Sequence, residues 1–399
     1  MTDLLWPGDH RAGHTFSDAA YLAAMVRVET AWLSVLVAAG IAPGSARADL
    51  TAAVSEADLE AVAVAAEATG NPVIGVLDLL RGRTGGEPAR WLHRGLTSQD
   101  VIDTALMLCL RDALERVRDE LTSQVRTVAA LTETYRDSPM LARTLTQPAA
   151  PTTLGMKFAN WLAGLLDGAD TLATLPALPV QAGGAAGTLA AATELTGSPT
   201  EALTLSGRLA TALGLADRPP WHTSRSVVTR AGDTLVTCCD AWAHIANDVA
   251  ASSRPEIGEL AEGRGGGSST MPHKNNPVLS ILIRRTALVA PSLAATLHVA
   301  SAHSIDERSD GGWHAEWTAL RTLSRYTVSA AGQTTELLAG LVVDAERAAA
   351  NLASAGGLLE EQRMMAELTG RGARRDYTGV VGPLIDAVLR RAHRLLDAT

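Results

Sequence analysis

Hydrophobic positions recur at helical spacing over long stretches of the chain. From Val101 to Asp137, apolar side chains follow every three or four residues, until Ser138 and Pro139 end the pattern. The spacing is stricter between residues 228 and 249, where it is a heptad pattern typical of helices packed lengthwise. Further helices are predicted over about 152–175, 277–300 and 316–342. Helices this long exceed the globular mean and indicate an elongated bundle.

Composition supports a helical fold. Aromatic residues make up only 4% of the 399 residues, and strand-like alternation does not recur. We therefore predict an all-α fold with an elongated central bundle of long helices and smaller N- and C-terminal helical domains. The predicted domains are 1–96, the bundle 97–342 with a glycine-rich loop at 262–268, and a short C-terminal domain 343–399.

Charge and cysteine content exclude several functions. The net charge is −9, so the chain lacks the basic footprint of a nucleic-acid-binding protein or of one that binds an anionic membrane surface. Three cysteines make no disulfide framework, which indicates a reducing compartment. No signal peptide and no uninterrupted apolar stretch of about 20 residues is recognised. We expect a cytoplasmic protein without nucleic-acid or membrane partners.

A glycine- and serine-rich loop leads into the predicted helix at 277. Asn276 suits the N-cap and Pro277 the first helical position. The free N–H groups of a helix N-terminus bind anions, and Lys274 adds a full positive charge there. Lys274 is one of two lysines among 34 basic residues, the other being Lys157. The segment predicts an anion site, although a capped linker explains it equally well when it is viewed alone.

Two other helix starts are rich in hydroxyl groups. They are Thr97–Asp100 and the segment from Thr144 to Thr153. Each one alone is explained by capping or by a proline-containing turn. Three such starts in one chain favour a site in which several helices present their N-termini to one polyanion. Because there is no Cys/His array, phosphate loop or dinucleotide fingerprint, we expect a site without metal or cofactor.

These segments resemble the fumarase/aspartase superfamily. Residues 267–277 match its signature loop, GSSxMPxKxNP, and residues 97–100 and 144–153 match two further regions. Within the superfamily the chain resembles the bacterial 3-carboxy-cis,cis-muconate cycloisomerases from about residue 15 to 355. That likeness rests on five segments: HRGLTSQDVIDTAL (93–106), GGAAGTLAA (183–191), WHTSR (221–225), GGSSTMPHKNNPV (266–278) and ERSDGGWHAEW (307–317).

The resemblance implies a homotetramer with active sites shared between subunits and a small polycarboxylate substrate. It implies reversible addition of a carboxylate to 3-carboxy-cis,cis-muconate through an aci-carboxylate, with proton transfer by Ser268. The expected catalytic residues are Ser268, Lys274, Asn276 and His93. The expected substrate-binding residues are Thr97, Ser98, Gln99, Thr144, Gln147, Arg225, Ser269, Met271 and Arg308.

Two departures from the superfamily pattern bear on function. Leu145 stands where most superfamily lyases carry a histidine that protonates the leaving group. A carboxylate departs without a proton, whereas an amine does not, so Leu145 disfavours a lyase of the adenylosuccinate type. The C-terminal region is also short. A lyase eliminating another weakly basic anion from a succinyl-type substrate, as in a nitrosuccinate lyase, and a catalytically silent structural member are the alternatives.

Overall fold

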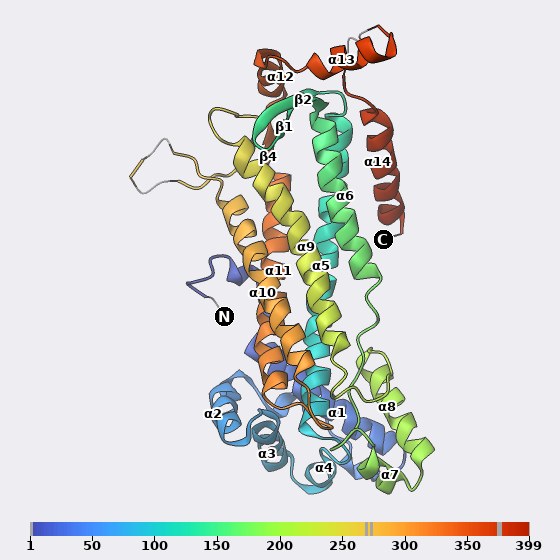
Figure 1. Cartoon of the computed structure of the whole chain (residues 1–399). Helices are drawn as coiled ribbons and strands as arrows, with labels where there is room; N and C mark the ends of the chain where they lie inside the picture. Colours follow the sequence, from blue (N-terminus) through green and yellow to red (C-terminus); the bar gives the residue numbers. More distant parts are fainter. Residues whose placement is uncertain (1–2, 268–269, 272–273, 373–376, 399) are drawn as a thin grey trace. The chain divides into compact units, whose positions relative to one another are not determined.

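Helices dominate the computed structural model, which describes residues 3–267, 270–271, 274–372 and 377–398. This confirms the predicted all-α class. The α-helices (Figure 1) are α1 (Asp18–Ala38), α2 (Leu59–Thr69), α3 (Val73–Thr84), α4 (Gly86–Trp91), α5 (Ser98–Thr134), α6 (Leu154–Ala173), α7 (Ala190–Thr196), α8 (Pro199–Leu213), α9 (Ser226–Ser252), α10 (Val278–Ala302), α11 (Gly311–Ala339), α12 (Ala345–Ser354), α13 (Glu360–Thr369) and α14 (Val381–Asp397). The strands are β1 (Pro139–Thr144), β2 (Gln147–Thr153), β3 (Leu260–Glu262) and β4 (Leu341–Val343), and the 3-10 helices are η1 (Asp9–Ala12), η2 (Gly44–Ala46), η3 (Thr51–Ala53) and η4 (Glu56–Asp58).

The long helices form where the hydrophobic spacing predicts them. Helices α5, α6, α9, α10 and α11 cover the five predicted stretches to within a few residues at each end. The heptad pattern in α9 is its buried face, because all seven of its side chains are at most 1% exposed: Val228, Ala231, Leu235, Cys238, Trp242, Ile245 and Val249. Tertiary packing of such a face contributes most of the stability of a helix in a protein.

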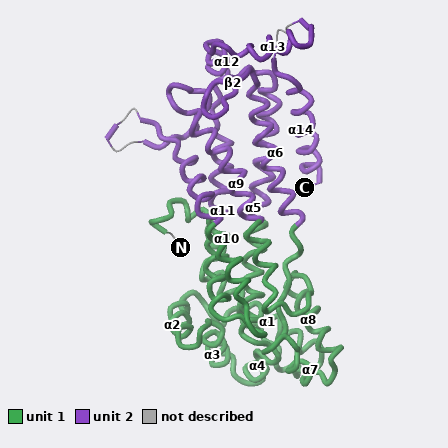
Figure 2. The backbone as a smooth tube through the Cα atoms, viewed as in Figure 1, with its two compact units in different colours: residues 1–115, 175–233, 292–326 green, residues 116–174, 234–291, 327–399 purple. Residues whose placement is uncertain are grey.

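The chain divides into two compact units, shown in Figure 2. Unit 1 contains residues 1–115, 175–233 and 292–326, and unit 2 contains residues 116–174, 234–291 and 327–399. Four of the five divisions fall inside helices α5, α9, α10 and α11, so each of these contributes residues to both units, and the fifth follows the end of α6. The domain boundaries predicted near residues 96 and 342 stay predictions.

A buried glutamine organises the helical core of unit 2. The Gln124 side chain on α5 accepts a hydrogen bond from the Trp242 indole N–H of α9 at 2.7 Å. Its amide donates to the Ala331 carbonyl at 2.9 Å and to the Thr335 hydroxyl at 3.0 Å, both on α11. Gln124 is fully buried, so these bonds satisfy polar atoms that are otherwise costly to remove from water. The network therefore fixes how three helices face one another within this unit.

Two small antiparallel sheets are present that the hydrophobic pattern did not predict. Strands β1 and β2 form a hairpin, and β3 pairs with β4. The hairpin lies where only a proline-containing turn was expected, because its strands are short and carry two prolines in β2. Its two-residue turn places Leu145 and Thr146 at φ 49° and 69°, a left-handed conformation that suits Asn and Gly. The Leu145 side chain is 96% exposed.

Helices α1 and α10 are long and apolar enough to cross a membrane by length and composition. Charged residues interrupt both helices, among them Glu29 in α1 and Arg284 in α10, so neither is the uninterrupted apolar stretch of about 20 residues that was not expected. The buried core helices of other proteins satisfy the same criteria of length and composition. Half or more of the relevant window of α1 is buried in the protein, whereas only 28% of the window of α10 is. Apolar side chains on α10 are exposed, among them Ile281, Leu288 and Val299.

The hairpin turn generates a prediction about stability. Replacing Leu145 by Asn and Thr146 by Gly should raise the free energy of unfolding by about 1–2 kcal/mol, because an L-residue in the left-handed conformation costs about that much. Thermal denaturation measures the change. Thr144→Gly, placed in the adjoining extended strand, is the control and should lower stability. A double variant that melts below the wild type would contradict the interpretation of the turn as strained.

Candidate active site

The N-terminus of α5 in unit 1 is only partly capped by the protein itself. The Asp100 carboxylate accepts a hydrogen bond from the Thr97 backbone N–H at 2.9 Å, and the Asp100 N–H donates to the Thr97 carbonyl at 3.0 Å. Among the described residues, the backbone N–H groups of Ser98 and Gln99 have no acceptor. Ser98 is partly exposed, whereas Gln99 is fully buried. Such N–H groups carry partial positive charge and bind carboxylates.

Asp100 holds this helix start in place from inside the protein. It is fully buried and accepts hydrogen bonds from the N–H groups of Gly183 and Gly184, both at 2.9 Å. The His222 Nε2 lies 3.1 Å from the same carboxylate. A Cβ at Gly183 would lie 2.5 Å from the His222 ring, so only glycine fits there. The segments that begin at residues 183 and 221 therefore hold Asp100, and with it the α5 N-terminus, in place.

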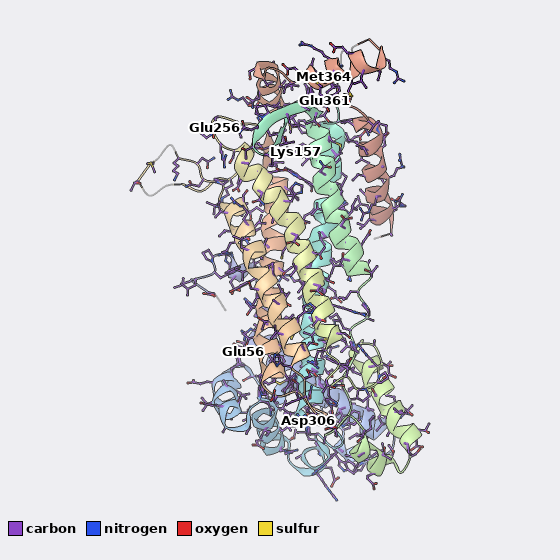
Figure 3. All side chains as sticks on the ribbon, in the orientation of Figure 1. Glu56, Lys157, Glu256, Asp306, Glu361 and Met364 are labelled. Carbon is purple, nitrogen blue, oxygen red and sulfur yellow. The ribbon has the colours of Figure 1, made fainter. Side chains whose placement is uncertain are left out.

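Arg308 places a full positive charge beside this helix start. Its Nη1 donates to the Thr97 hydroxyl at 3.0 Å, and the side chain is half-buried. Arg308 lies in the loop between α10 and α11 near Asp306, which Figure 3 labels. A guanidinium next to free backbone N–H groups is a suitable environment for a carboxylate. Thr97, Ser98 and Arg308 thus lie together as predicted, and their role in substrate binding stays a proposal.

Arg225 and Gln99 do not face this site as expected. The Arg225 guanidinium is fully buried and pairs with Asp103 at 2.7 Å and with Glu316 at 2.7 Å. Gln99 is also fully buried and donates to the His222 carbonyl at 3.0 Å. The Arg225 guanidinium and the Gln99 amide N–H groups bond to the protein's own carboxylates and carbonyls, whereas the buried Gln99 Oε1 has no partner among the described residues. Both residues therefore support the site structurally, which corrects the prediction that they bind substrate.

The Arg225 network carries an excess of negative charge. Burial works to lower the pKa of Arg225, but the carboxylates of Asp103 and Glu316 outweigh it and raise the pKa above its ordinary value. Burial raises the pKa of the Glu316 carboxyl, although the bonds from Arg225 act against this shift. Asp103 is also held by the Trp313 indole N–H at 2.9 Å. One cation thus pairs with two carboxylates inside unit 1. Asp103 accepts more hydrogen bonds than Glu316 does.

The N-terminus of α10 in unit 2 is already occupied, which corrects the predicted anion site there. The buried Glu262 carboxylate accepts hydrogen bonds from the N–H groups of Leu279 at 3.1 Å and Ser280 at 2.7 Å. It also accepts one from the Ser280 hydroxyl at 2.7 Å. The protein's own carboxylate therefore caps this helix and neutralises its dipole.

The signature loop is pinned together at its base. A backbone bridge joins Gly266 to Asn276, and the Asn276 amide donates to the carbonyls of Gly266 at 3.2 Å and Gly267 at 3.4 Å. The structure thus gives the Asn276 side chain a role in loop shape. Lys274 and Met271 are exposed. Ser268 and Ser269, the predicted proton-transfer and binding residues, lie outside the described residues.

The third predicted helix start, that of α6, is also satisfied internally. The Thr153 hydroxyl caps the Met156 N–H at 3.0 Å. Thr144 and Gln147 face each other as the last pair of the β1–β2 hairpin and are exposed. Arg143, next to them, is bound by both oxygens of the buried Glu259 at 2.7 and 2.9 Å. The end of the β1–β2 hairpin is therefore held in place through Arg143, while Thr144 and Gln147 beside the turn are exposed.

His93 lies four residues before Thr97 in unit 1. Its Nδ1 is 2.6 Å from an oxygen of Glu29, and its side chain is 16% exposed. Unit 1 thus holds the predicted residues His93, Thr97, Ser98, Gln99, Arg225 and Arg308, and unit 2 holds Thr144, Gln147, Met271, Lys274 and Asn276. Within the part of the chain that the structure describes, no group of three or more His, Cys, Asp or Glu residues is arranged to hold a metal ion.

Sequence reasoning missed the acidic residues that hold the site together. Glu29, Asp103 and Glu316 are buried carboxylates inside helices. A signal for Glu29 was present, because it follows Leu22 and Val26 and precedes Leu33 and Leu36 on the apolar stripe of α1. An acid on an apolar stripe requires a partner. Glu262 gave no comparable signal, because its partners are backbone N–H groups.

Comparison with known proteins agrees with these features. A family model described as "Lyase" matches residues 45–291. The chain therefore belongs to the fumarase/aspartase superfamily of lyases.

Several relatives carry specific names. A nitrosuccinate lyase of Streptomyces davaonensis is 43% identical, covering 88% of this chain and 77% of that protein. A 3-carboxy-cis,cis-muconate cycloisomerase of Bradyrhizobium diazoefficiens is 36% identical, covering 94% of this chain and 83% of that protein. The crystal structure of the 3-carboxy-cis,cis-muconate lactonizing enzyme of Pseudomonas putida superposes with a TM-score of 0.84 at 30% identity, covering 96% of this chain and 97% of that one.

The buried network of Arg225, Asp103 and Glu316 leads to a prediction that distinguishes loss of the cation from loss of one carboxylate. Arg225→Met should destabilise the protein by about 3–5 kcal/mol, because it leaves two buried carboxylates without a cation. Glu316→Gln should cost far less, because Asp103 still neutralises Arg225. Since burial raises the pKa of Glu316 above its unfolded value, ionised Glu316 lowers stability as pH rises through the folded pKa.

Chemical denaturation between pH 4.5 and 8 tests both statements. Glu316→Gln should become more stable relative to wild type as pH increases. Equal losses for Arg225→Met and Glu316→Gln at every pH would show that the charge imbalance is unimportant.

Proposed function

We propose that the protein interconverts 3-carboxy-cis,cis-muconate and a γ-carboxymuconolactone. The observation that carries this proposal is the partly uncapped N-terminus of α5, where Arg308 donates to the Thr97 hydroxyl beside the N–H group of the partly exposed Ser98. That arrangement suits one carboxylate of a polycarboxylate substrate. The named cycloisomerase relatives and the structural likeness to the P. putida enzyme support the choice of substrate.

The proposed chemistry is proton transfer next to a carboxylate. In the lactone-opening direction, Ser268 removes the proton from the carbon α to a carboxylate, and the C–O bond of the lactone breaks. Two negative charges then develop on the aci-carboxylate, so the main barrier is electrostatic. Lys274 is exposed and has no ion-pair partner among the described residues, which leaves its ammonium available for that charge. We assign Asn276 to holding the loop that carries Ser268.

Leu145 supports a leaving group that needs no proton. An aliphatic side chain cannot donate one, and a departing carboxylate has a pKa near 4, so it leaves as the anion. The same reasoning applies to nitrite. It does not apply to the amine that leaves in reactions of the adenylosuccinate type, so we do not propose that activity.

A second candidate function is elimination of nitrite from nitrosuccinate to give fumarate. The 43% identity to the nitrosuccinate lyase of S. davaonensis favours it. Both reactions form an aci-carboxylate and expel a weakly basic anion, so the same residues serve either one.

Ultraviolet absorbance distinguishes the two reactions. Wild-type protein should remove the conjugated diene absorbance of 3-carboxy-cis,cis-muconate, and Ser268→Ala should abolish this change. Release of nitrite and fumarate from nitrosuccinate, with the muconate unchanged, would establish the second candidate instead. A folded protein inactive on both substrates would contradict the proposal.

The two lysines provide a matched pair of variants in the same assay. Lys274→Ala should lower kcat/KM by about 100-fold or more, because it removes charge from the developing anion. Lys157 on α6, labelled in Figure 3, pairs with Asp248 at 3.1 Å. Lys157→Ala should therefore change thermal stability more than turnover. Equal, mild effects on turnover would contradict the role of Lys274.

We further propose that the chain forms a homotetramer with shared active sites. The resemblance implies it, and the surface of α10 supports it. Exposed positions recur at intervals of seven residues along that helix, at Ile281, Leu288, Ala295 and Ala302. Leu288 is 80% exposed. A continuous apolar face of this kind is typical of a surface that packs lengthwise against other helices.

Sedimentation velocity tests the assembly. Wild type should sediment as a tetramer, and Ile281→Arg with Leu288→Arg should shift it toward smaller species. Leu203→Arg on α8, where the leucine is 60% exposed, is the matched control and should leave the tetramer intact. A wild-type monomer would contradict the proposal.

A further inference from the structure

We propose that Glu29 is a positioning residue that sets the tautomer of His93, so that His93 carries the proton exchanged with solvent in each turnover. The inference rests on the proposed function. Opening or closing the lactone interconverts an ester and a carboxylate, so one proton is released or taken up per turnover. Elimination of nitrite from nitrosuccinate likewise releases one proton. The site therefore needs a group that passes a proton to and from water.

Glu29 is a buried acid whose only hydrogen-bond partner among the described residues is His93. It is 1% exposed, and its Oε1 lies 2.6 Å from the His93 Nδ1. Its other oxygen is buried and has no partner among the described residues. Removing a carboxylate from water is costly, and a single short bond does not satisfy it fully. The stability of the fold therefore does not explain why a carboxylic acid occupies position 29 on the apolar face of α1.

The turn that carries His93 is held in an uncommon conformation. His93 has φ +66°, in the left-handed region that few non-glycine residues adopt, and Gly95 has φ +91°. One helical turn after Glu29 on α1, the Trp32 indole N–H donates to the Arg94 carbonyl at 2.7 Å. Two side chains of α1 thus hold residues 93–95, Trp32 through a neutral bond and Glu29 through a charged one.

This arrangement assigns different roles to the two ring nitrogens. A carboxylate accepts a hydrogen bond, so Nδ1 carries the hydrogen and donates it to Glu29. In neutral His93, Nε2 then holds the lone pair. Among the described residues Nε2 has no partner, and it is not one of the buried unpartnered polar atoms, so it reaches solvent in this part of the structure. It is therefore the atom that takes up and releases the proton, while Glu29 keeps its hydrogen bond to Nδ1.

Nitrogen NMR of protein labelled with ¹⁵N-histidine tests the tautomer without any substrate. In the neutral form of the ring, reached by raising the pH until the ¹⁵N shifts stop changing, wild-type His93 should show a protonated Nδ1 and an unprotonated Nε2. In Glu29→Gln, the Nε2–H tautomer should become populated, because an amide can accept from or donate to Nδ1. His93→Gln identifies the signals. A wild-type Nε2–H tautomer, or no change in Glu29→Gln, would overturn the inference.

Kinetics then test whether Glu29 acts through His93. Glu29→Gln should lower kcat about 10- to 100-fold with little change in KM. The double variant Glu29→Gln/His93→Gln should be no slower than His93→Gln alone. Trp32→Phe is the matched control, because it removes the other bond to the same turn, and it should retain kcat within about threefold. Additive losses, or an equal loss in Trp32→Phe, would show that Glu29 only supports the fold.

The two proposals can fail separately. If the wild type turns over neither 3-carboxy-cis,cis-muconate nor nitrosuccinate, the proposed function is wrong, and the NMR result still supports or overturns the assignment of the tautomer. If turnover is normal but Glu29→Gln leaves both kcat and the tautomer unchanged, the proposed function stands and the inference about Glu29 is wrong.

Discussion

The buried guanidinium of Arg225 is the interaction on which unit 1 depends. It joins Asp103 on α5 and Glu316 on α11, residues 122 and 91 positions away in sequence. A forked cation with several donors satisfies two carboxylates at once, which a lysine cannot do. Because Asp103 lies one helical turn after the partly uncapped start of α5, the network fixes the helix that presents Ser98. A change at Arg225 would therefore disturb the candidate site without replacing any residue proposed to contact the ligand.

Helix capping decides where an anion can bind in this protein. The starts of α6 and α10 are occupied by Thr153 and Glu262, whereas at the start of α5 the N–H group of the partly exposed Ser98 has no acceptor among the described residues. A helix start is therefore a site only where the chain leaves it uncapped and adds a cation. In unit 1 that cation is Arg308.

The helices were predictable from sequence, whereas most of the site architecture was not. The spacing of residues such as Leu235 and Trp242 directly reports which face is buried, so α9 and its core face followed from the pattern. The hairpin at β1 and β2 did not, because its strands are short and irregular. Motif resemblance led to Thr97 and Arg308. It misassigned Arg225 and Gln99, since a conspicuous polar residue in a motif can equally be a buried support. Pairings such as Glu29 with His93 depend on tertiary contacts that spacing does not encode.

The scarcity of lysine has a practical consequence for labelling this protein. Lys157 is 18% exposed and paired with Asp248, while Lys274 is exposed on the signature loop. Apart from the α-amino group, an amine-reactive probe therefore meets one exposed lysine, Lys274, six residues after the proposed proton-transfer serine. A fluorophore attached there would report on that loop from one defined position, without any engineered cysteine.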